Sequence, residues 1–356
     1  MAVYQMMPTI TFGDGVSNDA LAMDVILRDM GIKTGIFAQN IGERLPANTV
    51  KNVSHFPKVL KDDVIIYHFS TGTELNTKVT EYDCKKVMVY HNITPGDFFL
   101  PYNADAANLC NSGRNDLKTV KAGFDHCIGV SEYNCLELKQ IGFQCDMDVL
   151  PIIIPFADYD KKPDDRILKK YGDGKVNLLF TGRIAPNKCQ EDVIGSFYFY
   201  HKYINQESRL ILNGSYEGME KYYDRLKRYA SGLGLEEDVI FTGKTSFAEV
   251  LGYYSVANAF ICMSEHEGFC IPLLEAMHFN VPVIAYDSSA VGETLGGAGI
   301  LLKEKDPQVT AEWIDMILSN DDLKTKLLKK QKERLEYFSE DKTERKFQVL
   351  IRGFVG

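Results

Sequence analysis

Short apolar runs alternate with stretches of helical hydrophobic spacing along most of this chain. In the first half, apolar runs predict buried strands at 33–38, 64–67, 86–90 and 126–130, and helical spacing predicts helices at 18–30 and 104–121. Strands that alternate with helices in this way are typical of parallel βαβ units. The first half therefore predicts a parallel sheet covered by helices.

The alternation stops near residue 150 and then restarts. Pro151, Pro155 and Pro163, followed by a charged stretch to Lys170, are interpreted as a linker. Beyond it, strands are predicted at 176–181, 209–213, 239–242, 259–263 and 281–285, with helices at 191–203, 219–232, 247–254 and 272–279. The last predicted helical segment runs from 311 to 338 and beyond, and it is strongly charged.

Two such sets of units predict an α/β protein with two doubly wound domains that face each other across a cleft. The predicted domains are residues 1–157 and 158–339, and a helix at about 340–356 can pack back on the first. The length of 356 residues agrees with this division, since a domain takes roughly 150 residues. Open α/β sheets bind ligands beyond the carboxyl ends of their strands, so we expect the chemistry in the loops that follow the strands.

Composition narrows the choice of partners and compartment. The formal net charge of -9 disfavours nucleic acid as a partner. The 8 cysteines form no Cys-x-x-Cys pair, which disfavours zinc and redox motifs and predicts reduced thiols. Residues 1–10 lack the features of a signal peptide, and no apolar run reaches the roughly 18 residues of a membrane helix. We therefore expect a cytoplasmic protein, with any membrane contact peripheral and at the inner face.

The loop after the strand predicted at 176–181 carries two basic residues. Arg183 and Lys188 lie five positions apart, and Gly182 lets the backbone turn sharply before them. A guanidinium offers a planar fork to phosphate oxygens and an ammonium offers a compact charge, which together suit a diphosphate. The alternative is a solvated pair on a surface loop.

The loop after the strand predicted at 259–263 combines an anion site with two acids. Pro272 stands where a helix is expected to start, so the backbone N–H groups from Gly268 to Ile271 are candidates to bind an anion. Glu267 lies in the loop and Glu275 lies in the predicted helix. Carboxylates beside an anion site make sense if they accept hydrogen bonds from sugar hydroxyls. The alternative is a charge pair at a helix N-terminus.

Together the two loops resemble glycosyltransferase family 4. The resemblance rests on Arg183-x4-Lys188 and on Glu267-x7-Glu275, which lies inside the stretch SEHEGFCIPLLEAM at 264–277. Segments at 226–243, 281–283 and 293–294 also fall where that family has comparable sequence, so the similarity covers most of the chain. It implies a retaining glycosyltransferase of the GT-B fold, with two Rossmann-like domains.

The resemblance also implies roles for the residues of both loops. Arg183 and Lys188 would neutralise the diphosphate of a nucleotide-sugar donor, Glu275 would hold its ribose, and the loop at 244–245 would lie beside the base. Glu267 and nearby backbone N–H groups would hold the hydroxyls of the transferred sugar. The implied donor-binding set is Gly15, Arg183, Lys188, Thr245, Glu267, Phe269, Cys270, Ile271 and Glu275, and the implied catalytic set is His91, Arg183, Lys188 and Glu267.

The first half adds a glycine loop. Gly13 and Gly15 precede the helix predicted at 18–30, and Ser17 or Asn18 is expected to cap that helix. In the family that this chain resembles, a glycine-rich loop here meets the donor phosphates, which favours Gly15. An ordinary turn is the alternative.

Two histidines of the first half follow predicted strands. His91 comes directly after the strand at 86–90, and His68 ends a neighbouring strand. Similar family members carry a histidine at the position of His91, close to the donor sugar and the acceptor, so His91 would orient the sugar and ease its positive charge. His68 ranks second, and a histidine with only a packing role is the alternative.

Two further sequence patterns are interpreted without a functional site. Asp146-x-Asp148 has the spacing of metal-dependent transferases but lies far in sequence from the donor loops, so no metal site is predicted. The basic run at 323–334 is typical of a solvated helix face, and contact with an anionic membrane is the alternative.

The expected reaction is retaining transfer of a hexose from a UDP- or GDP-linked sugar to a glycan or lipid-linked glycan, as in polysaccharide biosynthesis, with no cofactor. Two alternatives remain: a GT-B epimerase or phosphorylase, and a non-catalytic subunit that binds nucleotide sugars. A dinucleotide oxidoreductase is disfavoured, because Gly13-x-Gly15 lacks the third glycine of that fingerprint.

Chelation tests the metal prediction. Because charge on the departing diphosphate is assigned to Arg183 and Lys188, EDTA should leave donor turnover unchanged. A loss of activity that Mn²⁺ restores would contradict this and return attention to Asp146 and Asp148.

Overall fold

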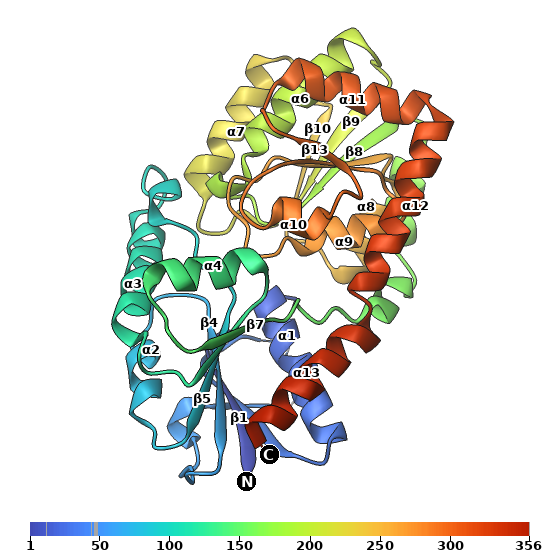
Figure 1. Cartoon of the computed structure of the whole chain (residues 1–356). Coiled ribbons are helices and arrows are strands. Elements are labelled where there is room, and N and C mark those ends of the chain that lie inside the picture. The colour runs from blue at the N-terminus through green and yellow to red at the C-terminus, as the bar shows by residue number, and fades with distance from the viewer. Residues whose placement is uncertain (12, 44, 46–48, 356) are drawn as a thin grey trace. The chain divides into compact units, whose positions relative to one another are not determined.

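The computed structural model describes residues 1–11, 13–43, 45 and 49–355. The chain forms two compact bodies (Figure 1). The first body takes residues 1–96, 107–155 and the chain from 338 onward, and the second takes 97–106 and 156–337. The predicted domains, in contrast, assign 97–106 to the first half.

The first body contains a seven-stranded parallel sheet in the order β3-β2-β1-β4-β5-β6-β7. β1 and β4 are neighbours in the sheet, so the direction of strand addition reverses between them, which is where open sheets bind ligands. The strands are β1 (Ala2–Ile10), β2 (Lys33–Ile41), β3 (Val50–Asn52), β4 (Val64–Phe69), β5 (Lys85–Tyr90), β6 (His126–Gly129) and β7 (Asp146–Val149).

The predicted strands of the first body omit β3, β7 and β1, and β1 is an interior strand of this sheet that pairs with β2 and β4. All of its residues except Thr9 are buried, so polar and apolar positions do not alternate. Its sequence, AVYQMMPTI, also contains few β-branched residues and one proline. A local pattern therefore gives little indication of this strand.

The helices of the first body are α1 (Gly15–Asp29), α2 (Leu75–Lys78), most of α3 (Ala104–Val120), α4 (Glu132–Ile141) and α13 (Glu340–Val355). The predicted cap of α1 is wrong. Asp14 is the N-cap and its carboxylate accepts the N–H of Ser17 at 3.1 Å, so the helix begins at Gly15. A carboxylate at this position caps as well as a hydroxyl and interacts favourably with the helix dipole. α13 packs beside α1 (Figure 1).

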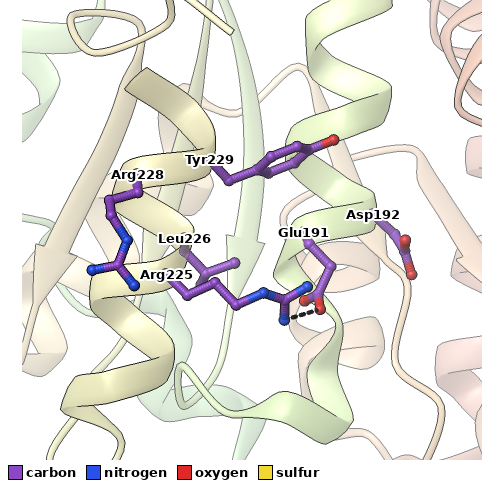
Figure 2. Close-up of a pocket in the computed structure, with 6 residues that line it drawn as sticks. All are labelled: Glu191, Asp192, Arg225, Leu226, Arg228 and Tyr229. Atoms are coloured by element: carbon purple, nitrogen blue, oxygen red, sulfur yellow. Dashed lines mark hydrogen bonds and ion pairs between the residues drawn. The ribbon is translucent and has the colours of Figure 1, made fainter. Parts of the chain in front are cut away.

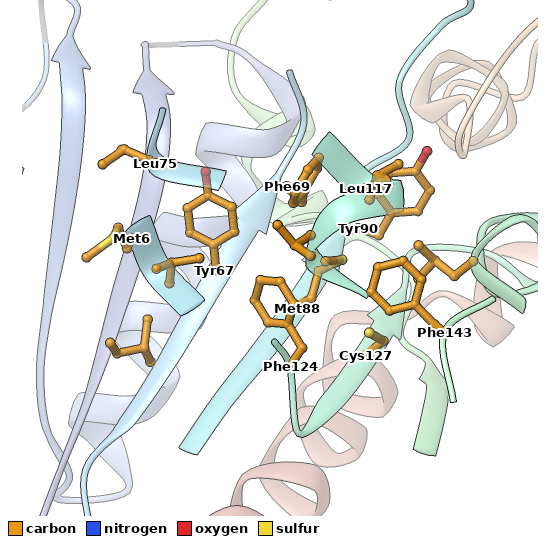
Figure 3. Close-up of a cluster of buried hydrophobic side chains, with 14 of the residues drawn as sticks. Met6, Tyr67, Phe69, Leu75, Met88, Tyr90, Leu117, Phe124, Cys127 and Phe143 are labelled. Carbon is orange, nitrogen blue, oxygen red and sulfur yellow. The ribbon is translucent and has the colours of Figure 1, made fainter. Parts of the chain in front are cut away.

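A cluster of large apolar side chains fills the space between β4, β5 and the helices that cover them (Figure 3). Tyr67 and Phe69 of β4 pack edge to face, with ring centroids 5.8 Å apart. The hydroxyl of Tyr67 donates to Asn76 at 2.6 Å, which satisfies a polar group inside the core. The cluster holds the carboxyl ends of β4 and β5 in place, and both ends carry a histidine.

The second body contains a six-stranded parallel sheet in the order β10-β9-β8-β11-β12-β13. The reversal here lies between β8 and β11, which pair at Ala259–Leu178 and Phe260–Leu179. The strands are β8 (Val176–Thr181), β9 (Ser208–Asn213), β10 (Val239–Gly243), β11 (Ala259–Cys262), β12 (Val283–Tyr286) and β13 (Ile300–Leu302). The helices are α5 (Asp165–Tyr171), α6 (Gln190–Tyr203), α7 (Glu220–Gly232), α8 (Phe247–Val256), α9 (Ile271–His278), α10 (Val291–Leu295), α11 (Pro307–Ser319) and α12 (Asp321–Tyr337).

Two predicted segments differ in detail. The charged segment from 311 onward is three helices, α11, α12 and α13. Asn320 separates α11 from α12, and its side chain accepts the N–H of Leu323 at 2.9 Å, while a second break at residues 338–339 precedes α13. The segment interpreted as a linker contains the short helix α5, whose N–H at Arg166 is capped by Asp164 at 2.8 Å. In both places a short polar side chain satisfies a helix terminus, an effect that hydrophobic periodicity does not register.

The basic helix α12 is only partly a solvated face. The side chain of Gln331 is buried and donates to the carbonyl of Val281 at 2.9 Å. Arg334 donates to the carbonyls of Glu293 at 2.6 Å and Thr294 at 3.1 Å. Across the described residues, none of the helices has the length and apolar character that crossing a membrane takes.

Candidate active site

The donor-site prediction falls on the second sheet, at the point where strand order reverses. The loop with Arg183 and Lys188 follows β8, and the loop with Glu267 follows β11. Because β8 and β11 are adjacent and parallel, the two loops leave the sheet at the same edge.

Lys188 and Glu267 are in direct contact. The ammonium nitrogen lies 2.5 Å from Oε1 of the carboxylate, with the two side chains 21% and 11% exposed. Burial opposes the charge of Lys188, but the charge and hydrogen bond of Glu267, together with the nearby Cys270 and Cys262, outweigh burial and hold the pKa of Lys188 above its ordinary value. The structure therefore places a fully charged lysine beside an acid, inside the loops selected from the sequence.

Asn187 fastens the two loops together. Its side chain donates to the carbonyl of His266 at 3.0 Å, and its own carbonyl accepts the N–H of Glu265 at 2.9 Å. The N–H of Glu267 in turn donates to the hydroxyl of Ser289 at 2.8 Å. The sequence interpretation missed Asn187 and Ser289, and the only signal available was the position of Asn187 beside Lys188.

Both helices that follow these loops begin at residues with unusual backbone geometry. Cys189, before α6, has φ of 50°, and Cys270, before α9, has φ of 75°. A side chain in this left-handed region costs on the order of 1–3 kcal/mol, and such positions cluster at functional sites. Ser289 has the same feature, with φ of 44°. Three strained residues thus adjoin the Lys188–Glu267 pair.

Phe269, Cys270 and Ile271 lie where a phosphate or sugar contact was predicted. Cys270 is the N-cap of α9 and Ile271 is its first residue. The hydroxyl of Thr294 donates to the carbonyl of Phe269, which fixes the loop against α10. The assignment of these backbone groups to the donor stays a prediction.

Glu275 lies in α9 and is held by two tyrosines. Tyr159 donates to Oε1 at 2.8 Å and Tyr254 donates to Oε2 at 2.7 Å. Burial raises the pKa of Glu275, and the two hydrogen bonds partly oppose that rise. Each carboxylate oxygen keeps a second lone pair, so a hydroxyl pair of a ligand remains chemically acceptable. Sequence reasoning missed both tyrosines.

Arg183 stands apart from the two acids. Its side chain is exposed and donates to the carbonyl of Glu217 at 3.3 Å. Within the described part of the chain, no salt bridge involves Arg183, so its charge is available to an anion. The tight approach of its loop depends on Gly214, where a Cβ would lie 1.9 Å from the carbonyl oxygen of Gly182.

Thr245 follows β10 and donates to Asn213 at 2.8 Å. Asn213 ends β9, and its side-chain oxygen also accepts the hydroxyl of Thr242 at 2.9 Å. Thr245 therefore lies at the carboxyl edge of the second sheet, the edge that also carries Arg183 and Lys188. Its predicted contact with a nucleotide base stays a prediction.

His91 and His68, which sequence analysis ranked first and second, form one pair in the first body, in which His68 is buried and His91 is half-buried. Nδ1 of His68 lies 2.9 Å from Nε2 of His91, and Nε2 of His68 lies 2.8 Å from the side-chain oxygen of Gln5. Burial lowers the pKa of His68 to about 3, and burial with the neighbouring His68 lowers that of His91. Asn92, directly after His91, has φ of 73°. Gly15 lies in the same body, as the first residue of α1.

Asp146 and Asp148 form part of β7 in the first body. Oδ2 of Asp148 lies 3.0 Å from Nε2 of His126, so this acid already has a partner. The side chain of Asp146 is exposed. This arrangement gives no support to a metal site at Asp146-x-Asp148.

A hollow of about 500 Å³ lies between α6 and α7, and its lining residues are not among the predicted site residues (Figure 2). Its charged groups neutralise one another in part, since Arg225 donates to Glu191 at 2.9 Å. The lining residues are Glu191, Asp192, Arg225, Leu226, Arg228 and Tyr229. We do not assign the reaction to this hollow.

Comparison with known proteins finds a family match within the second body. Residues 160–334 match the family model described as glycosyl transferases group 1. An uncharacterized glycosyltransferase of Methanocaldococcus jannaschii is 28% identical over 188 residues, which cover 51% of this chain and 46% of that protein. A GDP-mannose-dependent α-(1-6)-phosphatidylinositol monomannoside mannosyltransferase of Mycobacterium tuberculosis is 26% identical over 196 residues, 51% of this chain and 49% of that protein. The chain spans about half the length of these two relatives.

Solved structures share the fold over the whole chain. Anabaena HepE in complex with UDP-glucose aligns with a TM-score of 0.78 at 15% identity, covering 99% of this chain and 100% of that one. Sucrose-phosphate synthase from Thermosynechococcus elongatus aligns with a TM-score of 0.77 at 15% identity, covering 99% of both chains. These likenesses, with the two parallel sheets, confirm the predicted GT-B fold class.

Asp19, in the first body, is expected to make the stability of the folded protein depend on pH. It is 1% exposed and accepts the N–H of Ile153 at 2.9 Å, and burial raises its pKa from 3.8 to about 7. A raised pKa in the folded state means that stability is present at low pH and is lost as pH rises through about 7. Asp19→Asn keeps an acceptor for Ile153 and removes this cost, which is at most about 4 kcal/mol. Thermal unfolding should show the variant several degrees more stable than the wild type at pH 8 and nearly equal at pH 4. A wild-type advantage at pH 8 would contradict the analysis.

Proposed function

Through residues 160–334 this chain belongs to the group 1 glycosyltransferases, and we propose that it transfers a sugar from a nucleoside-diphosphate sugar to an acceptor hydroxyl. The observation that carries the proposal is the contact between Lys188 and Glu267 at 2.5 Å. It joins two loops at the strand-order reversal of the second sheet, inside the segment that matches the family. A polar pair of this kind suits a ligand that is anionic at one end and rich in hydroxyls at the other.

The diphosphate is assigned to the basic groups. The Lys188–Glu267 pair has no net charge, and Arg183 adds one positive charge, which lies near the carboxylate of Glu220 but forms no salt bridge among the described residues. Lys188 donates to Glu267 through one of three N–H groups, so two remain for phosphate oxygens. In this proposal the two cations stabilise the charge that develops on the departing diphosphate.

The sugar and ribose are assigned to the acids. Glu267 accepts hydroxyls of the transferred sugar, and Glu275, oriented by Tyr159 and Tyr254, accepts hydroxyls of the ribose. Holding each hydroxyl in one geometry places the anomeric carbon for attack and lowers the entropic part of the barrier.

The proposed chemistry retains the configuration of the anomeric carbon and uses no metal and no cofactor. The acceptor oxygen bonds to the anomeric carbon on the face from which the phosphate oxygen departs. The proton of the acceptor hydroxyl passes to that phosphate oxygen, so charge and atoms balance without a covalent sugar intermediate. His91 orients the sugar while positive charge develops on it.

The relatives support a hexosyl donor. The mycobacterial relative is a GDP-mannose-dependent mannosyltransferase by name, and the structure of HepE contains UDP-glucose. We propose a UDP- or GDP-linked hexose as donor and a glycan or lipid-linked glycan as acceptor, in a cytoplasmic polysaccharide pathway. Exposed lysines of α12, such as Lys326 and Lys329, support peripheral contact with an anionic membrane.

Thermal-shift measurements with UDP, GDP and their hexose conjugates test the donor. The proposal expects one nucleotide to raise the melting temperature and its sugar conjugate to be hydrolysed slowly or transferred. Conversion of free donor to its epimer would favour an epimerase, and binding without any turnover would favour a non-catalytic subunit. Absence of binding to every conjugate would refute the proposal.

Lys188→Ala tests the contact between Lys188 and Glu267 on which the proposal rests. Losing one preorganised cation should raise the barrier by about 2–4 kcal/mol, which lowers kcat/KM by about thirty- to several-hundred-fold. Lys305→Ala is the matched control, because Lys305 pairs with Glu265 at 2.7 Å in the same loop and with Asp192 at 2.8 Å. Equal losses in the two variants would show that general loop stability, and not the charge of Lys188, governs turnover.

A further inference from the structure

A line of hydrogen bonds runs through buried polar groups of the first body and ends at His91. It begins at the carbonyl of Ala20, which accepts the side-chain N–H of Gln5 at 2.9 Å. The side-chain oxygen of Gln5 contacts Nε2 of His68 at 2.8 Å, and Nδ1 of His68 contacts Nε2 of His91 at 2.9 Å. Gln5 and His68 are both fully buried.

The carbonyl of Ala20 determines which group donates in each of the following hydrogen bonds. A carbonyl oxygen only accepts, so the amide of Gln5 must turn its NH₂ toward Ala20 and its oxygen toward His68. That oxygen also only accepts, so the proton of His68 must be on Nε2. Burial lowers the pKa of His68 to about 3, so the ring is neutral and has a bare Nδ1.

The same logic passes to His91. A bare Nδ1 on His68 requires that Nε2 of His91 carry the proton and donate it. Burial and the neighbouring His68 lower the pKa of His91 as well, so this ring is neutral and its Nδ1 is also bare. Within the described part of the chain, Nδ1 of His91 is buried and has no hydrogen-bond partner.

We infer that Gln5 and His68 are positioning residues that set the tautomer of His91, so that its Nδ1 accepts a hydrogen bond from a hydroxyl of the bound sugar or acceptor. The inference rests on the proposed function for the identity of the ligand, but the tautomer itself does not depend on it. A bare nitrogen repels phosphate oxygens, which also only accept. The relay therefore assigns His91 to a hydroxyl and excludes it from the diphosphate.

A metal site is the competing reading of these residues. Ligand atoms of Asp19, His68 and His91 lie within 4.8 Å of one another, and Oδ2 of Asp19 has no hydrogen-bond partner among the described residues. Both nitrogens of His68 are already engaged, so a metal ion would have to break the line of hydrogen bonds. The relay accounts for the same geometry without such a loss.

Nitrogen-15 NMR of histidine-labelled protein tests the tautomer directly, and the chain has only 7 histidines to assign. The wild type should show His68 and His91 neutral and protonated at Nε2 between pH 6 and 8. Gln5→Leu removes the acceptor that directs the line, so both rings should shift toward a mixture of tautomers. His126, in the same sample, should keep its signals.

Two further variants separate the relay from general damage. Gln39→Leu is the control, because Gln39 lies in β2 of the same sheet and its side-chain oxygen accepts the hydroxyl of Thr73. This variant should leave both histidine tautomers unchanged. His68→Asn keeps an acceptor oxygen near the position of Nδ1, and it should restore part of the kcat/KM that His68→Phe loses. We expect Gln5→Leu and His68→Phe each to lower kcat/KM by about three- to tenfold, the range of one hydrogen bond.

The outcomes distinguish the relay from the proposed function. A wild-type His91 protonated at Nδ1 would overturn the relay whatever the activity, and because it needs no variant, this measurement survives if Gln5→Leu fails to fold. Stoichiometric Zn²⁺ that shifts the signals of both histidines would favour the metal site and also overturn it. The expected tautomers with full activity in His91→Ala would overturn the assignment of His91 to the substrate, while leaving Lys188 and Glu267 untouched.

Discussion

The contact between Lys188 and Glu267 is the interaction on which the candidate site depends. Two charges taken out of water lose hydration, and a buried ion pair often returns no more than it costs. This pair is mostly shielded, with side chains 21% and 11% exposed. Its value therefore lies less in stability than in holding a cation and an anion at one sheet edge, ready for a ligand that has both kinds of group.

The residues around the Lys188–Glu267 pair hold it in place, and some of them adopt unfavourable conformations to do so. Asn187 crosses between the loops after β8 and β11, and Ser289 accepts the N–H of Glu267. Cys189 and Cys270 take left-handed backbone conformations that are unfavourable for a side chain. The stability of the second parallel sheet, from whose strands both loops emerge, offsets the free-energy cost of these backbone conformations. In the first body the same principle operates through neutral groups, because Gln5 and His68 hold His91 without any charge.

The hydrophobic pattern of the sequence predicted most of the strands and helices of the second body. β8 coincides with its predicted strand, and the helices predicted at 191–203 and 219–232 differ from α6 and α7 by one residue at the start. These elements have a regular hydrophobic pattern, and glycines lie beside two of them, with Gly182 directly after β8 and Gly218 shortly before α7. β1 was beyond the same reasoning, since burial on both faces removes alternation. The break between α11 and α12 depends on one asparagine side chain and leaves no periodic signal.

By itself the sequence determined the fold class and the loops at the strand ends, and it predicted the residue types of a donor site, because all of these follow from local pattern and chemistry. Only the tertiary structure decided which groups meet. Asn187 and the carbonyl of His266 are 79 residues apart, His68 and Gln5 are 63 apart, and Tyr159 and Glu275 are 116 apart. Hydrogen bonds over such separations arise from strand order and register, and a periodicity read over a few turns of chain carries no information about either.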